Sequence, residues 1–170
     1  MDFAGFDMYA TAVWALYVAR EYDRSVEQAK KTLELDPNFA VGLESLALVY
    51  VAQRRYADAV AELEKLGPSS ALAIRYAGDL GYGYAMSGQR AEALRILAEL
   101  EGRSKREYVS PSARALIHMG LGDKDQAFAW LDRAYAERDW RLRELKAFPH
   151  FDSLRSDPRF ARLLKQMHLE

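Results

Sequence analysis

A spacing of 34 residues recurs through this chain and constrains its fold more than any other feature. Small residues stand at four positions related by this interval: Ser25, Ala59, Ala93 and Ala127. The same interval relates the residues that follow them, Val26, Val60, Leu94 and Phe128, and a further set in the preceding segment, Val13, Ala47, Gly81 and Ala115. A fixed period of this length, with small residues where helices would cross, predicts stacked helix pairs. The expected fold class is all-α.

Proline, glycine and apolar spacing divide each period into two helices. The expected helices cover residues 6–20, 22–35, 40–53, 56–66, 71–87, 90–103, 111–120 and 124–138. Tight turns join the two helices of each pair at Arg20, Arg54, Gly88 and Gly122. Such a turn favours a left-handed residue, which glycine adopts freely and arginine adopts with some strain. Four repeats are expected within a single domain over residues 1–170, at about 6–39, 40–73, 74–107 and 108–141.

The period ends after Arg138, and the rest of the chain is predicted to cover the end of the stack of repeats. Ser156-Asp157-Pro158 predicts the start of a last helix, because aspartate caps helix N-termini and proline is tolerated in the first turn. One apolar stripe follows along it: Phe160, Leu163, Leu164 and Met167. The open end of a stack of repeats needs a cover. The sequence therefore predicts a right-handed α-solenoid of four helix pairs with a C-terminal cap over residues 142–170.

Composition excludes several classes of partner. The 24 lysines and arginines nearly balance the 25 aspartates and glutamates, so neither nucleic acid nor an anionic membrane is expected to be the main partner. The chain has no cysteine, which rules out disulfides and thiolate metal sites. An apolar run from Met8 to Ala19 lacks a preceding lysine or arginine and is too short to span a bilayer, so it predicts a core helix. The expected location is cytoplasmic.

No pattern of catalytic or metal-binding residues emerges. His118, His150 and His168 stand on separate predicted elements without ligand spacing, so neither a metal nor another cofactor is expected. Gly78, Gly81 and nearby Gly83 approximate a phosphate-binding loop, but they lie within a helical period and no strand precedes them. We interpret them as sites of close helix packing. The chain is expected not to be an enzyme.

Two basic clusters raise the question of nucleic-acid contact. One spans residues 103–106, and the other includes Arg138, Arg141, Arg143 and Lys146 around Trp140. Acidic residues are interleaved with both clusters, which favours solvated ion pairs over a continuous positive track. Nucleic acid is therefore not an expected partner.

Three stretches go beyond a generic helical repeat: residues 108–111 (Tyr-Val-Ser-Pro), 120–128 (Gly-Leu-Gly-Asp-Lys-Asp-Gln-Ala-Phe) and 151–160 (Phe-Asp-Ser-Leu-Arg-Ser-Asp-Pro-Arg-Phe). With them, the whole chain resembles the tetratricopeptide-repeat segment that bacteria attach to winged-helix regulators, serine/threonine kinases and adenylate cyclases. The resemblance implies a non-catalytic interaction or regulatory module, normally joined to an effector domain. Its partner would be a protein or peptide, or a second copy of the chain.

In repeats of this kind, binding occurs mainly on the concave face, which the first helix of each pair lines. Helical phase places these residues on that face: Trp14, Tyr17, Val18, Glu44, Leu48, Val51, Arg75, Tyr82, Met86, Leu116 and Met119. Some family members hold a peptide carboxylate there with basic side chains, and only Arg75 would suit that role. The apolar groove suits an amphipathic helix or an extended apolar segment, including one from its own chain. Two alternatives stay open: some of these side chains are buried between repeats, or the exposed surface drives homodimerisation without a separate ligand.

Overall fold

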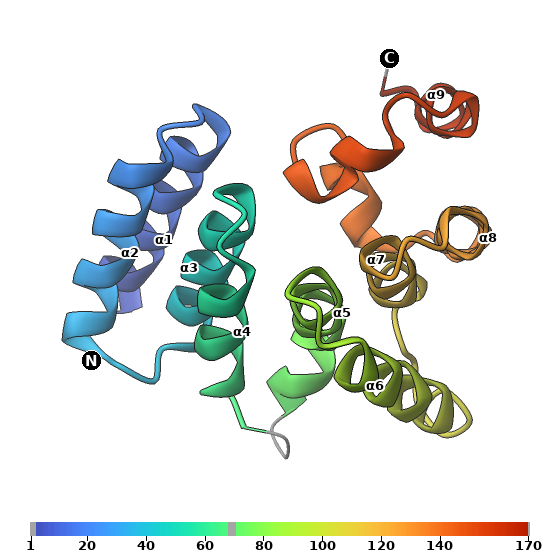
Figure 1. The fold of residues 1–170 in the computed structure, drawn as a ribbon. Helices are drawn as coiled ribbons and strands as arrows, with labels where there is room; N and C mark the ends of the chain where they lie inside the picture. The colour runs from blue at the N-terminus through green and yellow to red at the C-terminus, as the bar shows by residue number, and fades with distance from the viewer. Residues whose placement is uncertain (1–2, 68–70, 170) are drawn as a thin grey trace. The chain divides into compact units, whose positions relative to one another are not determined.

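The computed structural model describes residues 3–67 and 71–169, and the side chains of residues 3–10, 71–75 and 144 lie outside the described part. The described residues are helical or irregular, without strands (Figure 1). The α-helices are α1 (Phe3–Val18), α2 (Tyr22–Leu35), α3 (Ala40–Ala52), α4 (Tyr56–Glu64), α5 (Ala71–Met86), α6 (Arg90–Arg103), α7 (Pro111–Gly120), α8 (Lys124–Ala136) and α9 (Pro158–Gln166). Two 3-10 helices, η1 (Trp140–Glu144) and η2 (Pro149–Leu154), stand between α8 and α9.

The expected helix starts are confirmed for seven helices, α2 to α8, and the last helix begins at the expected proline, Pro158. The ends of α2, α6 and α7 also agree, whereas α3, α4, α5 and α8 end one or two residues early. The first helix begins three residues earlier than expected, at Phe3. Local signals therefore place the helices well, with the usual uncertainty at their ends.

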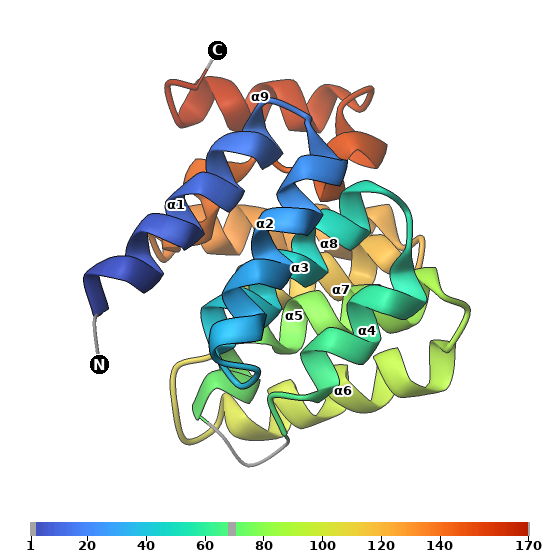
Figure 2. The ribbon, with the colours of Figure 1, turned by 90° about the vertical axis from the view of Figure 1, so that its left-hand side faces the viewer.

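Helices adjacent in sequence pack against each other. α1 packs with α2, α3 with α4 and α7 with α8, while α2 with α3 and α6 with α7 link successive pairs. The antiparallel α1 and α2 lie side by side in both views (Figure 1, Figure 2). The chain divides into two compact units, which we call unit 1 (Met1–Ala73) and unit 2 (Ile74–Glu170). Their boundary coincides with the expected junction of the second and third repeats, and the sequential packing is compatible with a helical repeat.

The turns within the helix pairs follow the 34-residue period in backbone geometry. Arg20, Arg54, Gly88 and Gly122 have positive φ angles of 61°, 59°, 85° and 81°. Each turn closes with the hydrogen bonds of a Schellman motif. In the second turn, for example, the Arg55 N–H donates to the Tyr50 carbonyl at 2.8 Å. The expectation that two of these turns hold arginine in a conformation better suited to glycine is confirmed.

Arg54→Gly is expected to raise the free energy of unfolding by about 1 kcal/mol, because glycine relieves the left-handed strain. Gly88→Ala is expected to lower it by a similar amount, since no neighbouring atom lies near the added methyl and only the backbone is strained. Chemical denaturation measures both. Equal stability of the Arg54→Gly variant and the parent would show that this turn is not strained.

The four periodic small residues are completely buried: Ser25, Ala59, Ala93 and Ala127. The hydroxyl of Ser25 on α2 donates a hydrogen bond to the carbonyl of Val13 on α1 at 2.9 Å, so the two helices approach closely there. Small side chains permit such approach. Their predicted role as points of helix contact is confirmed for this pair.

Within unit 2, α5 and α7 meet through glycine. A methyl group on Gly78 would lie 2.6 Å from the Cα atom of Ala113, and one on Gly81 would lie 2.6 Å from the Cγ1 atom of Ile117. A methyl group on Gly120 of α7 would likewise lie 2.8 Å from the Cβ atom of Ala85 on α5. Residue numbers rise together along the contact, so the two helices run in the same direction. The interpretation of Gly78 and Gly81 as close-packing sites is confirmed.

Helix α9 begins as its sequence predicts. The carboxylate of Asp157 accepts a hydrogen bond from the Arg159 N–H at 3.0 Å and so caps the N-terminus. Phe160 and Leu163 are buried, and α9 packs against α8. The apolar stripe of α9 therefore lies at a helix contact.

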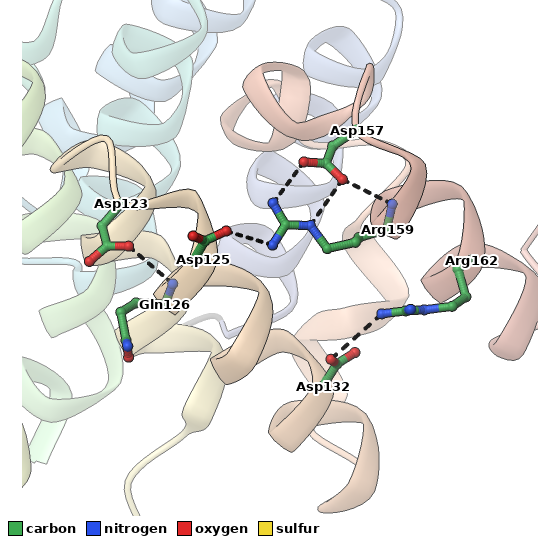
Figure 3. A network of polar contacts seen from close by, with 7 residues as sticks. All are labelled: Asp123, Asp125, Gln126, Asp132, Asp157, Arg159 and Arg162. Atoms are coloured by element: carbon green, nitrogen blue, oxygen red, sulfur yellow. Dashed lines mark hydrogen bonds and ion pairs between the residues drawn. The ribbon is translucent and has the colours of Figure 1, made fainter.

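Charged side chains reinforce this contact (Figure 3). The guanidinium of Arg159 donates to Asp125 on α8 at 2.8 Å, and also donates twice to Asp157, at 3.0 and 2.8 Å. A longer pair joins Arg162 to Asp132 at 3.9 Å. Hydrogen bonds from Arg159 lower the pKa of Asp157 to about 2. Asp157 is therefore ionised at neutral pH and holds Arg159 in place against α8.

Candidate functional site

The expected groove residues of unit 1 divide by exposure. Trp14 and Val18 on α1 are exposed, with 39% and 53% of their surface accessible. The Trp14 ring stacks on that of Tyr17, with 5.4 Å between centroids and 17° between planes. The other expected residues of this unit are buried or half-buried: Tyr17, Glu44, Leu48 and Val51.

The exposed pair defines an apolar strip on α1. Trp14 and Val18 are one helical turn apart and therefore share a face of the helix. Val13 and Tyr17, which border this pair on the helix surface, are buried, and the Tyr17 ring lies 5.9 Å from that of Tyr22 on α2. We call Trp14 and Val18 the α1 surface.

The expected groove residues of unit 2 are mostly enclosed. Met86 near the end of α5 is 37% exposed, whereas Tyr82 on α5 and both Leu116 and Met119 on α7 are buried. Arg75 lies in α5, but its side chain is outside the described part of the structure. Burial of these positions, left open as an alternative by the sequence, applies to most of those that can be described.

A polar cluster that the sequence did not predict forms where residues 139–154 meet α5. Asp79 on α5 accepts a hydrogen bond from Arg141 on η1 at 2.9 Å. The two side chains are 6% and 11% exposed. One turn further along α5, the Tyr82 ring lies 4.8 Å from the ring of His150 on η2. We call Asp79, Tyr82, Arg141 and His150 the α5 cluster.

His150 is the least satisfied member of the α5 cluster. It is 2% exposed, and neither of its ring nitrogens has a hydrogen-bond partner within residues 3–67 and 71–169. Burial lowers the pKa of His150 to about 4, nearby Asp79 opposes this effect, and the positive charge of Arg141 adds to it. The imidazole is therefore neutral at physiological pH.

Asp139 fixes the start of the segment that carries Arg141 and His150. Its buried carboxylate accepts hydrogen bonds from the backbone N–H groups of Ser112 and Arg141, both at 3.1 Å, and from the hydroxyl of Ser110. It thereby joins the N-terminus of α7 to that of η1. This single side chain caps both elements.

These contacts correct the interpretation of the second basic cluster. Arg141 and Asp139 are not solvated, because each makes buried polar contacts with another element. Arg143 and Lys146 are exposed as expected. Arg141 and Asp79 are 62 residues apart and outside the repeat period, so no spacing in the sequence could have paired them.

Among the side chains that the structure describes, no three of histidine, aspartate or glutamate gather as a metal site. Within the same residues, no helix has the length and apolar character needed to cross a bilayer.

Comparison with known proteins assigns no family. No protein-family model matches the chain, and no curated protein matches it.

Proposed function

We propose that the chain is a non-catalytic protein-interaction module. It would bind an apolar peptide or helix of a partner protein on the face that the first helix of each pair lines. The observation that carries this proposal is the exposure of Trp14 together with Val18 on one face of α1. We further propose that the helix pairs form a right-handed solenoid of the tetratricopeptide type. The periodic left-handed turns and the glycine contact of α5 with α7 support this architecture.

The α1 surface has the composition of a binding site for a polypeptide. An exposed tryptophan presents a large apolar ring, and tryptophan is enriched among residues that dominate binding energy. The stacking of Trp14 on the buried Tyr17 ring holds it in one orientation, which reduces the entropy lost on binding. An apolar residue one turn away extends the strip along the helix, as in complexes where a helix face receives an apolar segment.

The polar side chains of the α5 cluster are poorly placed for catalysis. The carboxylate of Asp79 is already neutralised by Arg141, and the His150 imidazole is enclosed. A general base needs access to the proton that it removes. The α5 cluster therefore resembles a structural contact more than a reactive centre.

Substituting both Trp14 and Val18 by serine tests the proposed function. The double variant is expected to weaken partner binding about 30-fold or more, because truncation of a central aromatic residue typically costs at least 2 kcal/mol. A partner would be captured with the immobilised parent chain, identified by mass spectrometry, purified and titrated by calorimetry. Leu35→Ser is the matched control, since Leu35 is also an exposed apolar residue of unit 1. Equal affinity of the parent and the double variant would contradict the proposal.

The same variants test homodimerisation. If the α1 surface binds a second copy, light scattering of the parent will show a concentration-dependent dimer, which the double variant loses and Leu35→Ser keeps. This second function involves the same exposed residues, so the two experiments together distinguish a foreign partner from self-association. A monomeric parent would eliminate the second function.

A further inference from the structure

We propose that residues 139–154 are an internal ligand of α5, and that the α5 face also binds, in trans, a peptide with an arginine and a flat ring at the same spacing. This inference rests on the proposed function and names a second binding surface and its partner class. Residues 139–154 are drawn in orange between α8 and α9 in Figure 1. We call them the C-terminal segment.

The contacts on α5 are those of a receptor face with two subsites. Asp79 and Tyr82 are three residues apart and therefore share one face of the helix. Each receives one side chain from a different 3-10 helix, Arg141 from η1 and His150 from η2. The first subsite supplies a buried carboxylate, which requires a cation, and the second supplies an aromatic ring, which accepts another ring.

The polar contacts of the C-terminal segment contribute more to the specificity of its docking on α5 than to the free energy of docking. Desolvation of Asp79 and Arg141 offsets much of their attraction. The two ring nitrogens of His150 lose water and gain no hydrogen bond in the described structure, so burying them opposes docking. The favourable free energy of docking comes instead from the burial of the segment's apolar side chains, Leu142, Leu145 and Leu154. An apolar residue in place of His150 would hold the segment more tightly, because it would leave no buried nitrogen without a hydrogen bond.

The internal ligand indicates the chemistry of an external one. Arg141 and His150 are nine residues apart, and the intervening chain forms 3-10 helices and a turn rather than one regular helix. A partner peptide that replaces it needs an arginine for Asp79, an aromatic or imidazole ring nine residues later for Tyr82, and apolar residues between them. A tethered segment has an effective concentration of about 1 mM, so it competes strongly with such a peptide until its own contacts weaken.

A labelled peptide with the sequence of residues 139–155 tests the inference against full-length protein. Binding to the Arg141→Gln variant is expected to be about tenfold tighter than to the parent, because the internal competitor is weakened while Asp79 stays available. Arg143→Gln is the matched control. It removes an exposed arginine of the same segment and is expected to bind the peptide as weakly as the parent does. A peptide that itself carries the Arg141→Gln change is expected to lose binding to the Arg141→Gln protein.

Hydrogen exchange of the parent protein keeps the test independent of how the variant folds. Backbone amides of the C-terminal segment are expected to exchange by local opening, at least about tenfold faster than those in the middle of α7. Equal protection of the two regions would overturn the inference, as would equal peptide binding by the parent and both variants. Either result leaves the proposed function intact if the Trp14 and Val18 substitutions still weaken partner binding, because those residues belong to unit 1.

Discussion

Replacing Gly78 by alanine is expected to lower the free energy of unfolding by roughly 3 kcal/mol, the upper end of overpacking effects. The added methyl would lie 2.6 Å from the Cα atom of Ala113, 2.8 Å from its Cβ atom and 3.0 Å from its carbonyl oxygen. These are mainly backbone atoms of α7, which cannot turn aside as the end of a side chain can. The helices α5 and α7 would have to separate. Urea denaturation monitored by circular dichroism measures the change.

Two other glycines are graded controls for Gly78. Gly81→Ala is expected to cost less, because its methyl would meet the Ile117 side chain, which can change rotamer. Gly102→Ala in α6 meets no neighbouring atom and is expected to stabilise the protein by up to about 1 kcal/mol through helix propensity. If Gly78→Ala were as stable as Gly102→Ala, the close crossing of α5 and α7 would be wrong.

Acidification from pH 7 to pH 5 is expected to destabilise the protein through His150. Its pKa is about 4 in the folded chain, against 6.5 for an ordinary histidine. Below pH 6.5 the unfolded chain therefore binds a proton that the folded chain does not, and the free energy of unfolding falls by up to about 1.4 kcal/mol per pH unit. The loss of stability that protonation of His150 causes is absent above pH 6.5 and complete by pH 4, about 3 kcal/mol in all.

The variant His150→Leu isolates this contribution. Leucine cannot be protonated and leaves no unsatisfied ring nitrogen, so the variant is expected to be at least as stable at pH 7 and to lose less stability towards pH 5. His118 contributes in the same direction, because burial lowers its pKa as well, and this part of the slope stays in the variant. His168→Gln, at an exposed position, is the control. Parallel pH profiles for the parent and His150→Leu between pH 7 and pH 5 would contradict the prediction.

The helical architecture was predictable because its determinants are local. Turns at Arg20, Arg54, Gly88 and Gly122 depend on a few consecutive residues, and their left-handed geometry repeats every 34 residues. Helix starts depend on capping and proline signals within one turn, as at Pro158. Helix position, turn geometry and the burial of small residues could therefore be inferred from spacing.

The candidate sites were only partly predictable. Trp14 and Tyr17 were placed on the same face by helical phase, yet one is exposed and the other buried. Leu94 shows the same limit. It is 44% exposed, whereas Val26 and Phe128, at equivalent positions of the period, are buried. Helical phase predicts the direction in which a side chain points. Whether that side chain is buried depends on which residues of the neighbouring helices pack against it.

The amino-acid sequence alone thus determines the secondary structure. It specifies an all-α chain of helix pairs, with left-handed turns at a regular interval and a last helix that begins at a proline after a capping aspartate. Folding in three dimensions decided the partners of the C-terminal segment. Arg141 pairs with Asp79 across 62 residues, and His150 lies against Tyr82 with its nitrogens buried. Backbone hydrogen bonds within helices and turns act over a few residues, whereas the burial of charge and rings depends on surfaces that exist only once distant helices have met.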